Sequence, residues 1–140
     1  MFLGEHRHSI DAKNRLFIPA KFRDELKESF IVAKPLRGKC LRICTKDAWN
    51  SYLEPIRKLP RPEAEVALRV LTKDASEVSP DAQGRVNLSG DLVKKAELGK
   101  NVVIVGCNDY IEVWAEAEFA RLFESYDEEK VYDHLMDLGL

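Results

Sequence analysis

The chain contains one five-residue pattern twice, as Asp11-Ala12-Lys13-Asn14-Arg15 and, 70 positions later, as Asp81-Ala82-Gln83-Gly84-Arg85. The fourth position holds Asn or Gly, the residues that best tolerate a left-handed backbone. Aspartate in the first position suits a tight turn, because its carboxylate accepts hydrogen bonds from backbone N–H groups two residues further on. Each copy therefore predicts a three-residue hairpin connection with positive φ at Asn14 or Gly84, followed at once by an arginine.

The repeat extends well beyond the two turns. A short alternating apolar run follows each arginine, and a helix start follows that run at Pro19 in the first copy and Ser89 in the second. Two further strands joined by a turn complete each unit, at 30–33 and 40–44 and at 102–105 and 110–114. About forty residues bury too little surface alone, so the two units are expected to share one core.

Helical segments follow each unit. Apolar residues at helical spacing predict helices over 47–53, 63–71, 116–124 and 128–138, whose stripes are expected to form core or subunit contacts. The expected division is therefore a first domain at 5–47, a helical linker at 48–75, a second domain at 76–119 and a helical tail at 120–140.

Composition excludes several classes of protein. No run approaches the ~20 apolar residues of a membrane span, and three cysteines among 140 residues do not indicate a disulfide framework. Cys40 and Cys44 would lie about 13 Å apart on one strand, too far to share a metal ion. His6 and His8 alternate without a third ligand at useful spacing. We expect a cytoplasmic protein that has no metal or cofactor and does not contact membranes.

The sequence also lacks the motifs of common enzymes. It contains no Gly-rich phosphate loop, no HExxH pair and no nucleophile motif with an adjacent base. A non-enzymatic function is therefore predicted.

The net charge of −2 conceals a gradient along the chain. Residues 1–49 carry 11 Lys and Arg against 6 Asp and Glu, a net charge of +5, whereas residues 76–118 carry 4 against 8, a net charge of −4. Residues 119–140 add 2 against 6, another −4. The basic first copy is the better candidate for contact with phosphate, and the acidic second copy and tail favour a head-to-tail fit between subunits.

Together with the opening Met1-Phe2-Leu3-Gly4, the paired turns and the two strand–helix–strand units resemble the MraZ family over nearly the whole chain. That family comprises bacterial transcriptional regulators of the division and cell-wall gene cluster, built of two SpoVT-AbrB domains. The resemblance implies an α+β fold with a swapped-hairpin β-barrel formed by the two tandem repeats of one chain, flanked by helices. It also implies ring-shaped homo-oligomers that bind repeated promoter elements in double-stranded DNA, at the nucleoid.

On that resemblance Arg15 and Arg85 are the motif arginines, with Asp11 and Asp81 as their partners. The second copy has Gln83 in place of Lys13 and Ser89 in place of Pro19, and the loss of charge places DNA binding on the first copy. The expected DNA-binding residues are Arg15, Lys13, Asn14, Arg7, His8 and Lys21, because a guanidinium beside a hairpin tip pairs with phosphate or guanine while neighbouring cations clamp the backbone. The structural motif residues are Asp11, Asp81, Gly84 and Arg85.

Two alternatives stay open at this point. One is that each Asp–Arg pair only holds its turn, which the charge pattern favours more for Asp81 and Arg85 than for Asp11 and Arg15. The other is a protein-interaction adaptor of the antitoxin type, without operator specificity. Salt-dependent binding to the chain's own upstream DNA separates a regulator from an adaptor.

Overall fold

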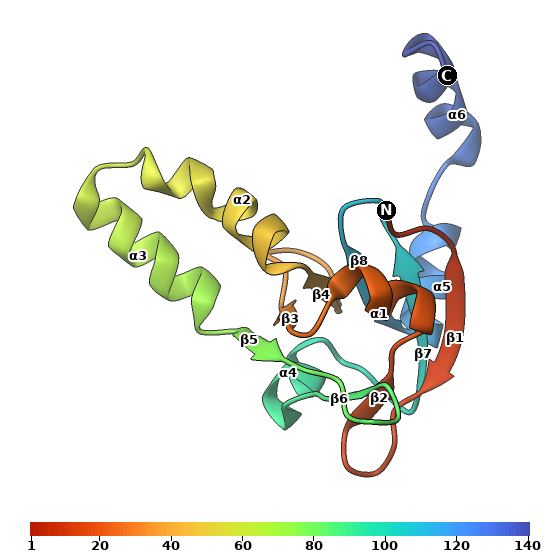
Figure 1. The fold of residues 1–140 in the computed structure, drawn as a ribbon. Helices are drawn as coiled ribbons and strands as arrows, with labels where there is room; N and C mark the ends of the chain where they lie inside the picture. The colour runs from red at the N-terminus through yellow and green to blue at the C-terminus, as the bar shows by residue number, and fades with distance from the viewer.

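The computed structural model describes all residues from 1 to 140 as eight strands and six helices (Figure 1). The strands are β1 (Glu5–Ser9), β2 (Arg15–Phe17), β3 (Phe30–Ala33), β4 (Cys40–Cys44), β5 (Ala75–Val78), β6 (Arg85–Asn87), β7 (Asn101–Gly106) and β8 (Ile111–Ala115). The helices are α1 (Ala20–Leu26), α2 (Lys46–Arg57), α3 (Arg61–Thr72), α4 (Gly90–Lys95), α5 (Glu116–Glu124) and α6 (Glu128–Asp137). The expected α+β class with two repeated units is confirmed.

Each copy lends its first strand to the other copy. Strand β1 of the first copy pairs antiparallel with β7 of the second, and β5 of the second copy pairs with β3 of the first. The two hairpins join through β4 and β8, which gives the sheet order β1-β7-β8-β4-β3-β5. The two halves are thus interlocked through their strands.

The expected closed barrel is not formed. The six-stranded sheet is open, with β1 and β5 at its edges, and β2 and β6 form a separate two-stranded ribbon. Strands β2 and β6 have three residues each, and only the isolated bridge between Ile10 and Leu16 links the first edge to the ribbon. The ribbon is too short and too weakly connected to close the sheet, although swapping between copies takes place.

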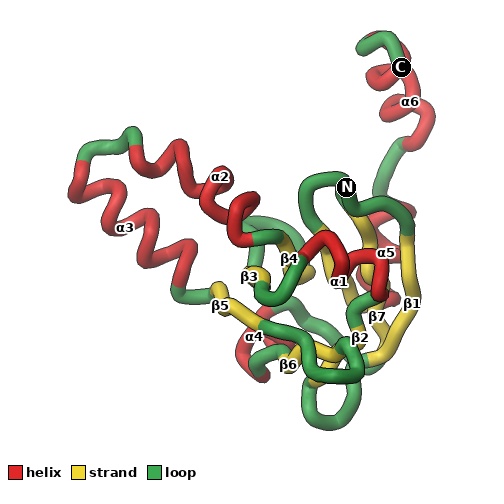
Figure 2. The backbone as a smooth tube through the Cα atoms, in the orientation of Figure 1, coloured by secondary structure: helices red, strands yellow, loops and turns green.

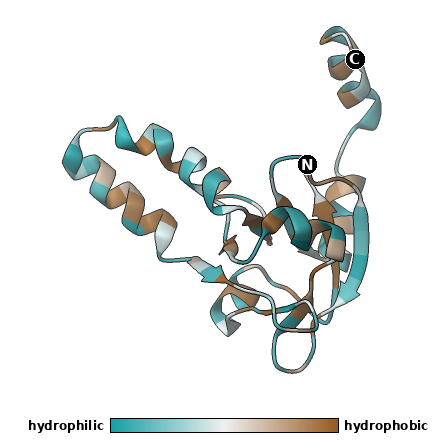
Figure 3. Cartoon of the chain, viewed as in Figure 1, coloured by the Kyte–Doolittle hydropathy of each residue, from teal (hydrophilic) through white to brown (hydrophobic).

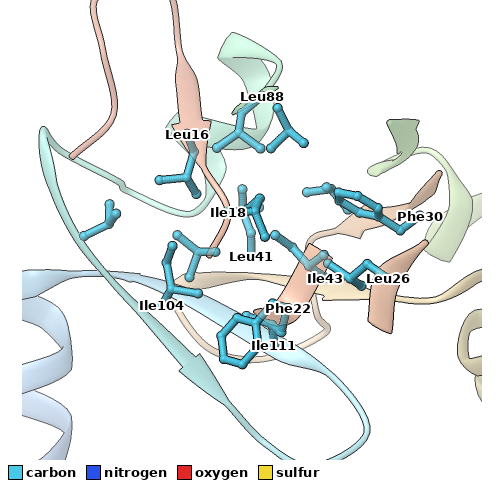
Figure 4. Close-up of a cluster of buried hydrophobic side chains, with 14 of the residues drawn as sticks. Leu16, Ile18, Phe22, Leu26, Phe30, Leu41, Ile43, Leu88, Ile104 and Ile111 are labelled. Carbon is cyan, nitrogen blue, oxygen red and sulfur yellow. The ribbon is translucent and has the colours of Figure 1, made fainter. Parts of the chain in front are cut away.

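The main hydrophobic core lies between the ribbon and the sheet (Figure 4). Leu16 of β2 and Val86 of β6 point into it from the ribbon, and Ile104 and Ile111 point into it from the hairpin of the second copy. Each fully buried side chain of this size contributes about 1.5–3 kcal/mol relative to exposure. Because both copies contribute, neither copy retains this core alone, as the sequence predicts.

The helix starts in the two copies use different chemistry, as expected. Pro19 immediately precedes α1, where its fixed φ suits a helix start. Ser89 instead caps α4 through its hydroxyl, which accepts a hydrogen bond from the Leu92 N–H at 3.1 Å. Both devices hold the residues that follow β2 and β6 in place.

The flanking helices differ in how they contact the sheet (Figures 1 and 2). Helix α2 packs Ala48 and Trp49 against β3 and β4, and α5 packs Phe119 beside Trp114. Helix α3 runs back along α2 as an arm with no buried residue. Every residue of α6 is exposed, so its apolar stripe does not join the core. None of the six helices is long and apolar enough to cross a bilayer.

Candidate nucleic-acid interface

The first turn is pinned by one carboxylate. Oδ1 of Asp11 accepts hydrogen bonds from the backbone N–H groups of Lys13 and Arg15, each at 2.9 Å. Oδ2 of Asp11 accepts a further bond from Nε of Arg15 at 2.7 Å. These bonds, led by that from the Arg15 N–H, hold the pKa of Asp11 below its usual value. The aspartate therefore stays ionised and fixes the direction in which the arginine leaves the turn.

The second turn repeats this geometry. Asp81 accepts from the backbone N–H groups of Gln83 and Arg85 at 2.9 Å and from Nε of Arg85 at 3.0 Å. The bond from the Arg85 N–H is again the largest reason why the pKa of Asp81 is lowered. The internal pair thus exists in both copies. It occupies only Nε of each guanidinium, so the terminal amino groups stay available as donors to a ligand.

The left-handed positions connect the two turns. Asn14 has a φ of 58° and Gly84 a φ of 79°, which confirms the expectation from the sequence. The carbonyl of Asn14 accepts from the Leu88 N–H at 2.8 Å, and the carbonyl of Gly84 accepts from the Ile18 N–H at 3.0 Å. Each turn is therefore hydrogen-bonded to the residue that follows the ribbon strand of the other copy, Leu88 after β6 and Ile18 after β2.

The ribbon brings both motif arginines onto one face. In the β2–β6 register Arg15 lies opposite Asn87 and Phe17 lies opposite Arg85. Because Leu16 and Val86 between them point into the core, these four side chains occupy the outer face. Arg15 and Arg85 are diagonal neighbours across the strand pair, a relation that places residues about 7–8 Å apart. The two arginines come from copies of opposite net charge. The charge pattern along the sequence therefore does not predict that they lie close together, because it is the β2–β6 pairing that joins the copies.

The cations around the two arginines differ strongly. Lys13 in the first tip and Lys21 on α1 are exposed, and neither side chain has a hydrogen-bonded or ionic partner within the chain. The positions that correspond to them by the 70-residue offset hold Gln83 and Asp91. The first tip therefore carries free lysines, as expected, and the second has none at the corresponding positions.

Two expected DNA-binding residues lie in less favourable surroundings. Nη1 of Arg7 is 2.8 Å from Glu5, and its Nε is 3.9 Å from Glu116 of α5, so two carboxylates already face this guanidinium. His8 packs its ring 5.4 Å from that of Phe17, and partial burial lowers its pKa. A lowered pKa leaves the imidazole neutral at neutral pH, which weakens any attraction to phosphate.

Asn14 also has a structural task. The side-chain amide of Asn14 faces the start of α4, where a Cβ added at Gly90 would lie 3.8 Å from its Nδ2. Asn14 therefore has two structural roles: its backbone takes the positive φ that the turn requires, and its side chain lies next to the second copy. Its amide has no hydrogen bond within the chain, so it stays a candidate donor at the tip.

Sequence reasoning missed the part that Arg23 plays. Its Nε donates to the Ile18 carbonyl at 2.9 Å, and its guanidinium lies over the Phe17 ring, 5.4 Å from the centroid. The same guanidinium covers the second turn, because a Cβ on Gly84 would come within 2.6 Å of Cζ. Phe17 and Asn87 were also missed, although strand alternation from Arg15 and Arg85 places them on the outer face.

The cysteines do not offer nucleophilic chemistry. All three are free, and burial raises the pKa of Cys40 to about 12 and of both Cys44 and Cys107 to about 11. These thiols stay protonated at neutral pH, and protonated thiols are poor nucleophiles.

The fold and the paired tips define a tandem, strand-swapped protein that presents arginines on one ribbon face. A family model described as "MraZ protein, putative antitoxin-like" matches residues 1–69 and 71–137. A transcriptional regulator MraZ of Clostridium tetani is 36% identical over 143 residues, covering 100% of both chains. The transcriptional regulator MraZ of Desulfitobacterium hafniense is 38% identical over 146 residues with the same coverage.

A third relative, the transcriptional regulator MraZ of Lachnoclostridium phytofermentans, is 37% identical over 142 residues and covers 100% of this chain and 99% of its own. The chain belongs to the MraZ family of transcriptional regulators, which are not enzymes. DNA is therefore the class of partner that this membership implies.

Proposed function

We propose that the chain is a sequence-specific regulator that binds double-stranded DNA through the outer face of the β2–β6 ribbon. The observation that carries the proposal is the state of Arg15. Its Nε donates to Asp11 while its terminal amino groups have no partner. The guanidinium is therefore fixed in orientation and can still donate hydrogen bonds to a ligand. Such a fork suits guanine O6 and N7 or a phosphate, and the major groove admits a two-stranded ribbon.

We assign different roles in DNA binding to the residues around Arg15. Lys13 and Lys21 serve as phosphate clamps, because both are exposed and unpaired. Asn14 offers its amide at the tip. Arg7 and His8 contribute less, since Arg7 must first leave Glu5 and Glu116 and His8 is neutral.

The proposal includes assembly into a ring on repeated promoter elements of the division and cell-wall gene cluster. One ribbon face is small and offers few contacts, so binding of useful strength requires several subunits on spaced repeats at once. The segments proposed for assembly are the helical linker at 48–75 and the tail at 120–140, which leave the first domain at 5–47 free for DNA. A regulator of this kind works in the cytoplasm at the nucleoid.

A DNA-shift titration with the chain's own upstream region tests the proposal. An unrelated duplex of equal length serves as the control, and both are titrated at low and at moderate salt. We expect tighter binding to the upstream region at every salt concentration, with affinity falling as salt rises. Equal affinity for the two duplexes would contradict the proposed sequence specificity.

One observation favours a second candidate function. The matching family is described as antitoxin-like, and an adaptor of that type acts through protein contacts without operator specificity. Absence of any shift with both duplexes, for a folded protein, would favour the adaptor over the regulator.

A further inference from the structure

Asn87 is the uncharged polar side chain on the outer face of the β2–β6 ribbon. It is the last residue of β6, a strand in which hydrophilic residues lie on either side of the buried Val86 (Figure 3). The residue is exposed, and its side-chain amide makes no hydrogen bond within the chain. Its side-chain carbonyl oxygen and both amide protons are therefore available to a ligand.

The other uncharged side chain on this face is already covered. The guanidinium of Arg23 lies 5.4 Å from the centroid of the Phe17 ring, and the ring of His8 lies 5.4 Å from it as well. These contacts leave Phe17 half-buried between its neighbours. By the 70-residue offset Asn87 is the counterpart of Phe17 in the second copy, yet it is exposed. The two copies therefore present different chemistry at this position.

The register of the ribbon gives this difference a consequence for binding. Arg15 lies opposite Asn87. Arg85, at the equivalent position of the second copy, lies opposite Phe17. Exchanging the two copies exchanges these two pairs, so the arginines alone would allow the ribbon to lie on a duplex in either of two opposite orientations. Asn87 lies beside only one of the arginines and therefore distinguishes the two orientations.

We propose that Asn87 reads an adenine next to the DNA contact of Arg15, and so determines both the sequence preference and the orientation of each subunit on DNA. Residues directly opposite each other in an antiparallel pair have Cβ atoms about 4.5–5.5 Å apart. That spacing is close to the ~3.4 Å step between bases of one strand, so the two side chains reach neighbouring base pairs. Asparagine fits the major-groove edge of adenine, because its carbonyl oxygen accepts from N6 and its amide donates to N7.

This inference rests on the proposed function, because it requires the ribbon to lie in the major groove. The reading pair is shared between the copies, since Arg15 comes from the first and Asn87 from the second. Loss of the Asn87 amide removes no charge, and the proposed phosphate contacts of Lys13 and Lys21 stay in place. We therefore expect a change in sequence preference with little change in the salt dependence of binding.

The test couples one side chain of the full-length protein to one atom of the DNA. Duplexes of the chain's own upstream region are prepared in which one adenine at a time is replaced by 7-deazaadenine, which lacks the N7 acceptor but keeps Watson–Crick pairing. At one or more positions the replacement should weaken binding of the parent about 2-fold to 12-fold, the equivalent of one hydrogen bond. At those positions Asn87→Ala should bind the replaced and the natural duplex equally, because it has no amide donor.

The titrations are run at low salt, where the phosphate contacts alone retain measurable binding by Asn87→Ala. Asn50→Ala is the matched control, because Asn50 is exposed on α2 away from the ribbon. It should respond to each replaced adenine as the parent does. The preference of Asn87→Ala for the upstream region over an unrelated duplex should also fall, by about 5-fold to 150-fold per engaged subunit if both hydrogen bonds are made.

Two results would overturn the inference while leaving the regulator intact. In the first, the parent prefers the upstream region but no replaced adenine weakens its binding. In the second, the same replacements weaken the parent and Asn87→Ala by equal factors, so the N7 contact belongs to another residue. Equal binding of the upstream and unrelated duplexes by the parent would instead contradict the proposed function and this inference together.

Discussion

The two turn tips have the same backbone and different surroundings. Asp11 and Asp81 make equivalent hydrogen bonds to the residues that follow them, and Arg15 and Arg85 have side chains that are 32% and 30% exposed. The first tip is flanked by free lysines, whereas the second carries no lysine of its own. The comparison shows that the repeated pattern determines the conformation of the turn. The lysines next to the turn, which only the first copy has, are what we expect to attract DNA.

One residue of the first copy contacts both tips. Arg23 on α1 lies over Phe17 and also covers Gly84 of the second turn. The corresponding position in the second copy is Val93, so no equivalent cation covers Asn14. The left-handed position is therefore the more enclosed in the second tip, where Gly84 is buried while Asn14 is only half-buried.

Apart from the loss of Arg15 itself, the largest effect is expected from giving the first tip the charges of the second. Lys13→Gln combined with Lys21→Asp removes two proposed phosphate contacts. The slope of log affinity against log salt should then fall in magnitude by about 2 per engaged subunit. A salt titration of DNA binding measures it, and Lys58→Asp, in the turn between α2 and α3, is the control that should keep the parent slope. An unchanged slope in the double variant would remove these lysines from the interface.

The second effect concerns the stability of the enclosed tip. Gly84→Val should lower the free energy of unfolding by about 2–3 kcal/mol, because a β-branched residue is strained at positive φ and its Cβ displaces Arg23. Urea denaturation measures this change. Gly99→Val is the control, since a Cβ at Gly99 meets nothing within 4 Å. Equal stability of the two variants would show that the left-handed turn is not needed.

The smallest effect is expected on acid stability. The pKa of both Asp11 and Asp81 is lowered in the folded chain, so each ionised carboxylate stabilises the fold above its unfolded pKa of about 3.9. That stabilisation is lost as pH falls through the lower, folded pKa. Melting temperatures of the Asp11→Asn, Asp81→Asn double variant should therefore depend less on pH below pH 5 than those of the parent. Asp133→Asn should follow the parent, and a parallel decline in all three chains would argue against the two pairs as the cause.

Local features of the fold could be predicted from the sequence because neighbouring residues determine them. The Asp–Arg turns follow from Asn14 and Gly84, which tolerate positive φ, and the start of α4 follows from the hydroxyl of Ser89. The shared core follows from units too small to fold alone. The swapped pairing came from the family resemblance rather than from any local pattern.

Tertiary contacts account for what the sequence did not predict. The proximity of Arg85 to Arg15 depends on pairing between strands 70 residues apart, and Glu116 reaches Arg7 only because α5 lies beside β1. Closure of a barrel depends on hydrogen bonds along the short β2 and β6 strands, which residue patterns do not specify. A groove lined by Trp49 and Tyr110 likewise joins segments that are distant in sequence.

The most direct measurement compares Arg15→Ala with Arg85→Ala for binding to the upstream DNA at matched salt. Losing Arg15 should cost about 1–3 kcal/mol per engaged subunit if it contacts a base. Because several subunits bind together, Arg15→Ala should abolish measurable binding while the mass of the particle stays unchanged. Arg85→Ala should keep most of the affinity, since its tip carries no free lysine. Parent-like binding by Arg15→Ala, or loss of binding only in Arg85→Ala, would contradict the assignment of DNA binding to the first tip.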